Sequence, residues 1–391
     1  MERVIFKFLH DNNHFYKYQA GFLPGHSTVY QLIETYDNIL KSIDDGKSCC
    51  MIFCDLSKAF DRVWHKGLLY KLKSYGINGD LLLWFKSYLE DRKQRVLYRD
   101  SISSLKHVQA GVPQGSVLGP LLFFIYINDV ADEMDTFCRL YADDNSLQHS
   151  SNNLNNIETC LNNDLMKLQS WSNKWLLKFN PTKTKGIFFT RNKNIGNPKL
   201  YFQQCQLQFV DHHKHLGITF SPDLSWSSYI NILLANAGKR LGVMKKYKFK
   251  INRNTLSLMY TSFIRPLLEY ASEVWGTCIT QNESEKLEKF QLCAARIVTG
   301  LTLLASRDAL YFETGWEPLT YRRKLTILKT IYKMDNHLSP NCLKDIFPCN
   351  TSSYNKRNTI NYNVPKCKLQ IYKNSYVPTV INEWNSLPVE N

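Results

Sequence analysis

The stretch Tyr141-Ala142-Asp143-Asp144 constrains this chain most, because it places two carboxylates side by side between short apolar runs. Apolar segments on both sides of so short a polar stretch predict a β-hairpin with both acids at its tip. Adjacent carboxylates repel each other, and they stay ionised together when a cation shares them. Two-metal phosphoryl transfer requires such a pair, although the pair taken alone is only a weak signal for it. A polar turn without a ligand is the alternative.

A third carboxylate follows the continuous apolar run Cys49–Cys54, which predicts a buried central strand. Ligands gather at strand ends in open sheets, so we expect Asp55 to lie near the hairpin acids. The three acids would form a cage for Mg²⁺, which prefers oxygen ligands, and the backbone oxygen of Leu56 would add another. The alternative role for Asp55 is to cap the helix that follows the strand.

The loop from Gly111 to Pro120 is the third element of interest. Gly111 and Gly115 allow the backbone to approach a ligand closely, and Gln114 offers both a donor and an acceptor. The apolar run from Pro120 to Val130 predicts a buried helix after the loop. A simple turn before that helix is the alternative interpretation.

The net charge of +15 predicts a polyanionic partner. The excess is concentrated, because fifteen Lys and Arg residues lie between Trp171 and Arg253 against only two acids, Asp211 and Asp223. This concentration favours nucleic acid over a merely solvated basic face. The eleven cysteines are irregularly spaced, no secretory signal opens the chain, and no apolar run could span a bilayer. We therefore expect an intracellular protein of the nucleus and cytoplasm that does not associate with a membrane.

The periodicity of the chain changes near Ser221-Pro222-Asp223, and helical spacing dominates beyond it. The spacing predicts four helices in this part, at Ile230–Lys246, Leu256–Tyr270, Glu283–Thr299 and Tyr321–Met334. We predict a first domain at residues 1–222, a helical one at 223–340 and a poorly patterned segment at 341–391.

The three elements together, in this order, resemble the reverse transcriptases of non-LTR retrotransposons, especially the jockey-like LINE elements. The matching segments extend over nearly the whole chain and include Ala20–Thr28, Phe53–His65, Ala110–Asp129, Leu140–Asp144, Trp175–Lys185, His215–Gly217, Arg265–Tyr270, Leu287–Ala295 and Gly315–Pro318. The resemblance implies an RNA-directed DNA polymerase of the α+β class, shaped as a right hand. Partial fingers and a palm with an antiparallel sheet would fill residues 1–222, followed by a mostly helical thumb and connection.

The resemblance also implies the roles of several residues. Asp55, Leu56, Asp143 and Asp144 would hold two Mg²⁺ ions, with Mn²⁺ as an alternative, and the substrates would be dNTPs, a DNA primer and an RNA template. The ring of Phe60 would crowd the 2′-carbon and exclude ribonucleotides, with ordinary core packing as the alternative.

Further residues match positions that contact the substrates. Gln114 and Gly115 would touch the incoming nucleotide, and Tyr141 would lie against the primer end. Lys183 would protonate the departing pyrophosphate, although Lys185 is a competing candidate.

The nucleic acid itself would be held by the later part of the chain. His215-Leu216-Gly217 resembles the primer grip. A run of cations without an acid suits a thumb helix that follows a template–primer backbone; it consists of Lys239, Arg240, Lys245, Lys246, Lys248, Lys250 and Arg253. Such contacts are independent of sequence and weaken steeply with salt.

Two departures from the family pattern matter. Leu23 stands where many jockey-like relatives carry Arg, and Met1 is followed at once by sequence that resembles the middle of the fingers. The resemblance therefore implies an N-terminally truncated chain, whose grip on the nucleotide's phosphates would be incomplete. The alternative function is a catalytically inactive remnant that only binds RNA or DNA.

Overall fold

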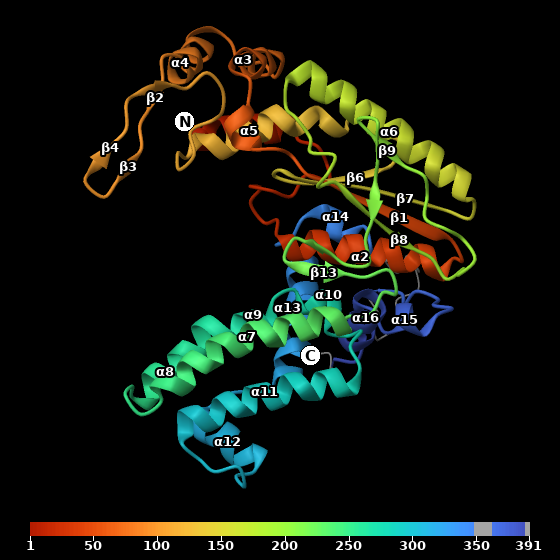
Figure 1. Cartoon of the computed structure of the whole chain (residues 1–391). Helices are drawn as coiled ribbons and strands as arrows, with labels where there is room; N and C mark the ends of the chain where they lie inside the picture. Colours follow the sequence, from red (N-terminus) through yellow and green to blue (C-terminus); the bar gives the residue numbers. More distant parts are fainter. Residues whose placement is uncertain (348–361, 388–391) are drawn as a thin grey trace. The chain divides into compact units, whose positions relative to one another are not determined.

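The computed structural model describes residues 1–347 and 362–387 (Figure 1). The chain divides into two compact units, which are described separately below. Unit 1 comprises Met1–Thr28, Lys47–Phe188 and Asn192–Val210, and unit 2 comprises Val29–Gly46, Phe189–Arg191 and Asp211–Asn391 as far as it is described. The functional boundaries near residues 222 and 340 stay predictions. Residues 348–361 and 388–391 of the predicted last segment lie outside the described residues.

Unit 1 combines a five-stranded sheet with helices. Its helices and short 3-10 turns are α1 (Glu2–Asp11), η1 (Ala59–Arg62), α3 (His65–Ser74), α4 (Gly79–Leu89), α5 (Leu118–Ile127), η2 (Asn128–Ala131) and α6 (Leu154–Trp175). The strands of the main sheet run in the order β11 (Gln208–Phe209), β8 (Lys185–Phe189), β1 (Ser48–Cys54), β7 (Asp144–Ser151) and β6 (Phe137–Tyr141). Short two-residue strands form separate ladders: β2 (Lys93–Gln94) with β5 (Lys106–His107), β3 (Leu97–Tyr98) with β4 (Ser101–Ile102), and β9 (Tyr201–Phe202) with β10 (Cys205–Gln206).

The predicted central strand is confirmed, because β1 is the middle strand of the five and Cys49–Cys54 are all buried. It pairs antiparallel with β7, and β7 pairs antiparallel with β6. The expected antiparallel sheet is thus present around the hairpin, whereas β11 and β8 pair in parallel, which makes the whole sheet mixed.

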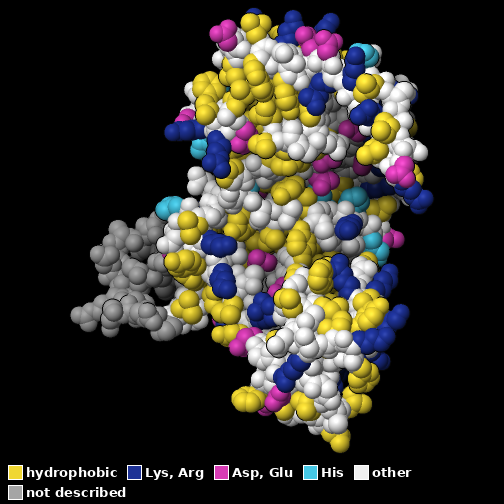
Figure 2. Space-filling model, turned by 90° about the vertical axis from the view of Figure 1, so that its left-hand side faces the viewer, with side chains coloured by type: hydrophobic (Ala, Val, Ile, Leu, Met, Phe, Trp, Pro, Cys, Tyr) yellow, Lys and Arg dark blue, Asp and Glu magenta, His cyan; other side chains and the backbone are white. Residues whose placement is uncertain are grey.

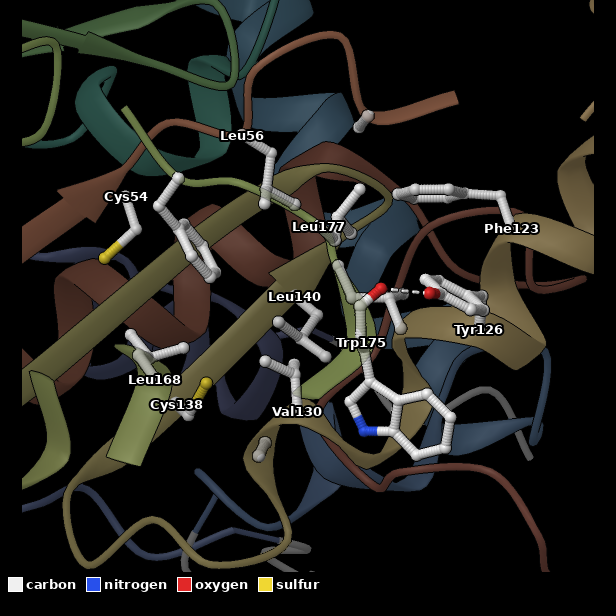
Figure 3. Close-up of a cluster of buried hydrophobic side chains, with 14 of the residues drawn as sticks. Cys54, Leu56, Phe123, Tyr126, Val130, Cys138, Leu140, Leu168, Trp175 and Leu177 are labelled. Atoms are coloured by element: carbon white, nitrogen blue, oxygen red, sulfur yellow. Dashed lines mark hydrogen bonds between the residues drawn. The ribbon is translucent and has the colours of Figure 1, made fainter. Parts of the chain in front are cut away.

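The core of unit 1 lies between this sheet and the helices α5 and α6. Helix α5 is apolar all round and almost wholly buried, as expected for the run 120–130, although it begins two residues earlier. Helix α6 presents one buried face, which includes Leu161, Leu165 and Leu168. Figure 3 shows side chains of β1, β6, α5 and α6 converging in this core, where Tyr126 donates a hydrogen bond from its hydroxyl to the carbonyl of Trp175.

Unit 2 is mostly helical. It contains α2 (Thr28–Asp44), the hairpin β12 (His213–His215) and β13 (Ile218–Phe220), α7 (Ser227–Tyr247), α8 (Arg253–Met259), α9 (Arg265–Glu269), α10 (Ser272–Trp275), α11 (Gln281–Thr299), α12 (Arg307–Thr314), α13 (Leu319–Asp335), α14 (Asn341–Lys344), α15 (Gln370–Lys373) and α16 (Tyr376–Asn385). Together with the mixed sheet of unit 1, these helices confirm the α+β class with a helical C-terminal part.

The single helix predicted at Leu256–Tyr270 is wrong in detail. The structure has α8, one turn of π-helix at Tyr260–Ile264, and then α9 with Pro266 in its first turn. Proline has no amide hydrogen and its ring crowds the preceding turn, so a regular α-helix cannot continue through it unchanged. The other three predicted helices correspond to α7, α11 and α13. No helix in the described part of the chain is long and apolar enough to cross a membrane.

Candidate active site

The predicted hairpin is present, and both acids lie at its tip. Strands β6 and β7 are joined by the two-residue loop Ala142–Asp143, with Tyr141 paired to Asp144 across the last rung. Ala142 has a φ of +55°, the left-handed conformation that tight two-residue hairpin loops require. A residue with a Cβ pays about 1–2 kcal/mol for this conformation, so the surroundings must hold the turn in place.

The register of the sheet brings the third acid to the same place. Cys54 is the last residue of β1 and lies opposite Asn145 of β7. Because the two strands are antiparallel, the next residue, Asp55, lies opposite Asp144 and on the same face of the sheet. The backbone register therefore places the three acids at one end of the sheet, and their joint role as metal ligands stays a prediction.

Asp55 does not cap a helix, so the alternative role considered for it is wrong. The following turn, η1, has Lys58 as its N-cap residue and receives no side-chain cap. The backbone of Asp55 is instead tied to the segment 180–184, because Asn180 N–H donates to the Asp55 carbonyl at 2.8 Å and Asp55 N–H donates to Thr184 Oγ1 at 3.4 Å. In the described part of the chain, no backbone amide donates to the Leu56 carbonyl. Its role as a ligand stays a prediction.

The electrostatics of the site agree with this geometry. Partial burial raises the pKa of the Asp144 carboxyl above its ordinary value of 3.8, and the charges of Asp143 and Asp55 raise it further. A basic side chain lies nearby, because Lys183 Nζ is 4.0 Å from Asp55 Oδ2. The competing candidate, Lys185, donates instead to Gln208 Oε1 at 2.6 Å. Of the two candidates, only Lys183 thus forms an ion pair with Asp55 among the described residues.

The donor set fits hard divalent cations in its chemistry. Three carboxylates and a carbonyl oxygen are the ligands that Mg²⁺ prefers, and the mutual repulsion that acts on Asp144 is what a bound cation would relieve. Among residues 1–347 and 362–387, however, no three His, Cys, Asp or Glu side chains are already close enough to form a metal site. The carboxylates would have to draw together when a cation binds.

Phe60 lies on η1, five residues after Asp55, and its ring is held by two others. It stacks on Phe123 of α5 with the centroids 4.3 Å apart, and it meets Phe22 edge-on at 6.1 Å. The side chain is only partly buried. Core packing therefore fixes the position of the ring and leaves part of it accessible, so the two roles considered for Phe60 are compatible.

The loop before α5 is tied to η1. Gly111 N–H donates to the Val63 carbonyl, and Gln114 Nε2 donates to Asp61 Oδ1, both at 2.8 Å. A Cβ on Gly111 would lie 2.9 Å from the Asp61 backbone, so the close approach that this glycine allows is to the chain itself and not to a ligand. Gly115, with a φ of +79°, has open space around it, which leaves its predicted contact with a nucleotide untested.

The residues predicted to hold the nucleic acid lie in unit 2. His215, Leu216 and Gly217 form the tight end of the β12–β13 hairpin, where the Leu216 carbonyl accepts a 2.6 Å hydrogen bond from the Tyr270 hydroxyl. A Cβ on Gly217 would lie 2.7 Å from the Tyr270 ring, which explains the glycine.

The predicted thumb cations lie in the second half of α7 and in the segment that comes directly after it. Lys239, Lys245, Lys246 and Lys250 are exposed, and Lys248 is half-buried. Two cations of the run have partners within the chain, because Arg240 donates to the Phe263 carbonyl and Arg253 pairs with Glu313 at 2.9 Å. Figure 2 shows one face of the molecule, with lysine and arginine side chains scattered among hydrophobic and other side chains.

One polar residue at the turn was not predicted from the sequence. Gln19 is fully buried and accepts a hydrogen bond from the Ala142 amide in the loop between the two strands. It directly precedes the segment Ala20–Thr28, whose resemblance to known proteins was recognised, but nothing in its own sequence context indicates the contact.

Comparison with known proteins identifies the relatives of this chain. Residues 1–220 match the family described as reverse transcriptase (RNA-dependent DNA polymerase). The probable RNA-directed DNA polymerase from transposon BS of Drosophila melanogaster is 33% identical over 343 residues, which are 82% of this chain and 35% of that protein. The RNA-directed DNA polymerase from mobile element jockey of the same species is 31% identical over 297 residues, which are 73% of this chain and 32% of the relative.

The chain thus spans about a third of the length of the curated relatives it matches. Among solved structures, apo telomerase from Candida tropicalis aligns with 88% of this chain and 57% of its own, at 13% identity and a TM-score of 0.45.

Proposed function

This chain belongs to the reverse transcriptase (RNA-dependent DNA polymerase) family, on the branch of the non-LTR, LINE-type retrotransposons, and we propose that it extends a DNA primer on an RNA template. The substrates in this proposal are dNTPs, and the products are the lengthened primer and pyrophosphate. We propose that the protein localises to the cytoplasm and the nucleus, because LINE-type copying needs both an RNA and a chromosomal DNA end.

One observation carries the proposal. The register of β1 against β7 and the tight loop at Ala142–Asp143 bring Asp55, Asp143 and Asp144 to the same end of the sheet. The charges of Asp143 and Asp55 raise the pKa of the Asp144 carboxyl, and a bound cation would relieve this repulsion.

Asp55, Asp143 and Asp144, together with the Leu56 carbonyl, would hold the divalent cations. Two Mg²⁺ ions, when bound, would neutralise charge on the phosphates and lower the pKa of the primer's 3′-hydroxyl. Mn²⁺ has the same ligand preference and is the alternative ion. The carboxylates themselves position and neutralise; they form no covalent bond with the substrate.

The chain's other residues act on the substrates. The primer's 3′-hydroxyl gives up its proton to water, its oxygen forms a bond to the α-phosphorus, and the bond from that phosphorus to the oxygen that bridges to the β-phosphate breaks. Lys183, which lies beside Asp55, would donate a proton to the departing pyrophosphate. Phe60, held by Phe123, would lie under the sugar of the incoming nucleotide and reject a 2′-hydroxyl.

We propose that the unit 2 residues hold the template–primer. The exposed lysines of α7 would contact phosphates, and Leu216 and Gly217 would support the primer strand. Arg253 contributes least in this proposal, since Glu313 already neutralises it.

Primer extension with purified protein tests the function. We expect Mg²⁺-dependent incorporation of dNTPs into a DNA primer annealed to RNA, and no incorporation by Asp143→Asn. Binding of the template–primer by this variant should stay near that of the unchanged chain, because the substitution removes a carboxylate and leaves every Lys and Arg side chain in place.

Asp80→Asn provides the matched control. Asp80 is an exposed acid in the first turn of α4, so the substitution changes the net charge equally. It should extend the primer normally. Extension by Asp143→Asn at the unchanged rate would refute the proposed site, whereas binding without any incorporation by the unchanged chain would favour the inactive remnant.

A further inference from the structure

A segment near the N-terminus lies along the edge of the sheet beside the acidic turn. Leu140 N–H donates to the Tyr18 carbonyl at 3.1 Å, and Ala20 N–H donates to the Leu140 carbonyl at 2.9 Å. Gln19 therefore forms a parallel bridge with Leu140 of β6. The segment continues the sheet for a few residues beyond β6, and it ends level with the loop that carries Asp143.

The side chain of Gln19 reaches the loop itself. Its Oε1 accepts hydrogen bonds from the Gly21 amide at 2.9 Å and from the Ala142 amide at 3.3 Å. Both partners are N–H groups, which only the amide oxygen can satisfy. The residue that receives this support, Ala142, is the one in the left-handed conformation. The bond therefore acts where the turn is least favourable.

Close packing restricts the turn from the same side. A Cβ on Gly21 would lie 2.3 Å from the Ala142 nitrogen and 3.1 Å from its Cα. Such distances are far below van der Waals contact, so this position accepts only glycine without movement of the loop. Gln19 and Gly21 together hold Ala142 by a hydrogen bond and by steric contact.

The demands of folding do not account for Gln19. Its side chain is fully buried, and among the described residues its Nε2 has no hydrogen-bond partner. An unpaired buried donor lowers stability; an apolar side chain of the same length would avoid that loss, but it would leave the amides of Gly21 and Ala142 without their acceptor. What the glutamine provides in return is the acceptor for the loop amide.

We propose that Gln19 is a positioning residue of the active site, which fixes the loop Ala142–Asp143 and so holds Asp143 and Asp144 at the end of the sheet where Asp55 lies. The inference rests on the proposed function of these acids. Gln19 touches neither substrate nor cation in this account; it acts through the backbone of Ala142.

The substitution Gln19→Met tests this role, because methionine has nearly the same length and no acceptor for the amide. We expect kcat for primer extension to fall about ten- to 100-fold, as expected when reacting groups lose their alignment. KM for dNTP, binding of the template–primer and the thermal unfolding midpoint should change little. A loss of kcat without a loss of stability separates positioning from a structural role.

The matched control is Gln31→Met. Gln31 lies on α2, is also buried, and also has no hydrogen-bond partner for its amide among the described residues. Its substitution should leave kcat unchanged. Equal kcat values for the two variants would overturn the proposal, as would a fall in the thermal midpoint of Gln19→Met that matches its loss of activity. If Gln19→Met does not fold, Gly21→Ala should give the same selective fall in kcat, because its Cβ displaces Ala142.

A second measurement does not depend on catalysis. In protein labelled with ¹⁵N-alanine, exchange of the Ala142 amide with solvent should be about fivefold faster in Gln19→Met than in Gln31→Met. Unchanged exchange would overturn the role of Gln19. If the unchanged chain shows no extension but the exchange rates differ as expected, the proposed function fails while the contact of Gln19 with the loop holds.

Discussion

Replacement of Lys71 by methionine gives the most quantitative test of the packing beneath the active site. Lys71 lies on α3 with its side chain only 3% exposed. Its ammonium group donates to the Tyr126 carbonyl and to Asp129, and it lies 3.9 Å from the centre of the Trp175 ring. The charge thus ties α3 to the end of α5, the helix that also supports Phe60.

The size of the effect follows from the pKa of this group. Burial lowers the pKa of Lys71 from 10.5 to about 8, although the charge of Asp129 opposes the change. In the unfolded chain the proton is held up to about pH 10.5, so between pH 8 and 10.5 the unfolded state binds more protons than the folded state. The folded state therefore gains stability as pH rises through this interval, by about 1.4 kcal/mol per pH unit and about 3 kcal/mol in total.

Urea unfolding of the unchanged chain and of Lys71→Met between pH 7 and 9.5 measures this gain. The difference between the two unfolding free energies should be constant below about pH 8. Above that, it should shift in favour of the unchanged chain by about 1.4 kcal/mol per pH unit. Other groups that titrate in this range are common to both proteins and cancel. If the unfolding free energies of the unchanged chain and of Lys71→Met changed in parallel with pH across the whole range, the buried, partly desolvated state of this lysine would be refuted. Lys73 is an exposed neighbour on α3, and Lys73→Met should show such a parallel profile.

Three further predictions concern the active site. Phe60→Ala should raise incorporation of ribonucleotides relative to dNTPs at least about tenfold in primer extension, because the ring no longer excludes the 2′-hydroxyl; unchanged selectivity would leave the ring only its packing role. Lys183→Gln should slow single-turnover incorporation about 100-fold, the usual contribution of a general acid, while Lys185→Gln should have little effect; the reverse order would assign the proton to the other lysine. Asp144→Asn should unfold at a higher urea concentration than the unchanged chain at pH 7 without divalent cations, because the raised pKa shows that the ionised carboxylate is unfavourable there. The difference should shrink as the pH falls through the raised pKa toward the ordinary carboxyl pKa of 3.8, and it should stay constant below that value, where Asp144 is protonated in both the folded and the unfolded chain.

The main features of the site could be predicted because they depend on local sequence. A hairpin between two apolar runs needs only short-range information, and so does a buried strand that ends at Asp55. The order of these elements resembles that of a known family, and this resemblance predicted that they lie at one end of the sheet. The β1–β7 register places the backbones of Asp55 and the hairpin acids at one end of the sheet, and the comparisons confirm the family.

Contacts between distant segments could not be predicted in this way. Gln19 and Lys71 are polar residues whose partners lie 123 and 58 positions away, in Ala142 and Asp129. No periodicity indicates that either side chain is buried, since composition alone would place both at the surface. The break of the expected helix 256–270 had a local signal in Pro266, which helical periodicity outweighed.

Binding of divalent cations by the three acids tests the central claim most directly. Mn²⁺ can be titrated by electron paramagnetic resonance into a complex with a dideoxy-terminated primer, its RNA template and the next dNTP. Asp55→Asn should weaken Mn²⁺ binding as strongly as Asp144→Asn does. In the unchanged chain, Mg²⁺ should compete with Mn²⁺ for the site. The control variant Asp80→Asn should bind Mn²⁺ as tightly as the unchanged chain. Unaltered Mn²⁺ binding by Asp55→Asn would mean that the strand end and the hairpin tip do not share a metal site.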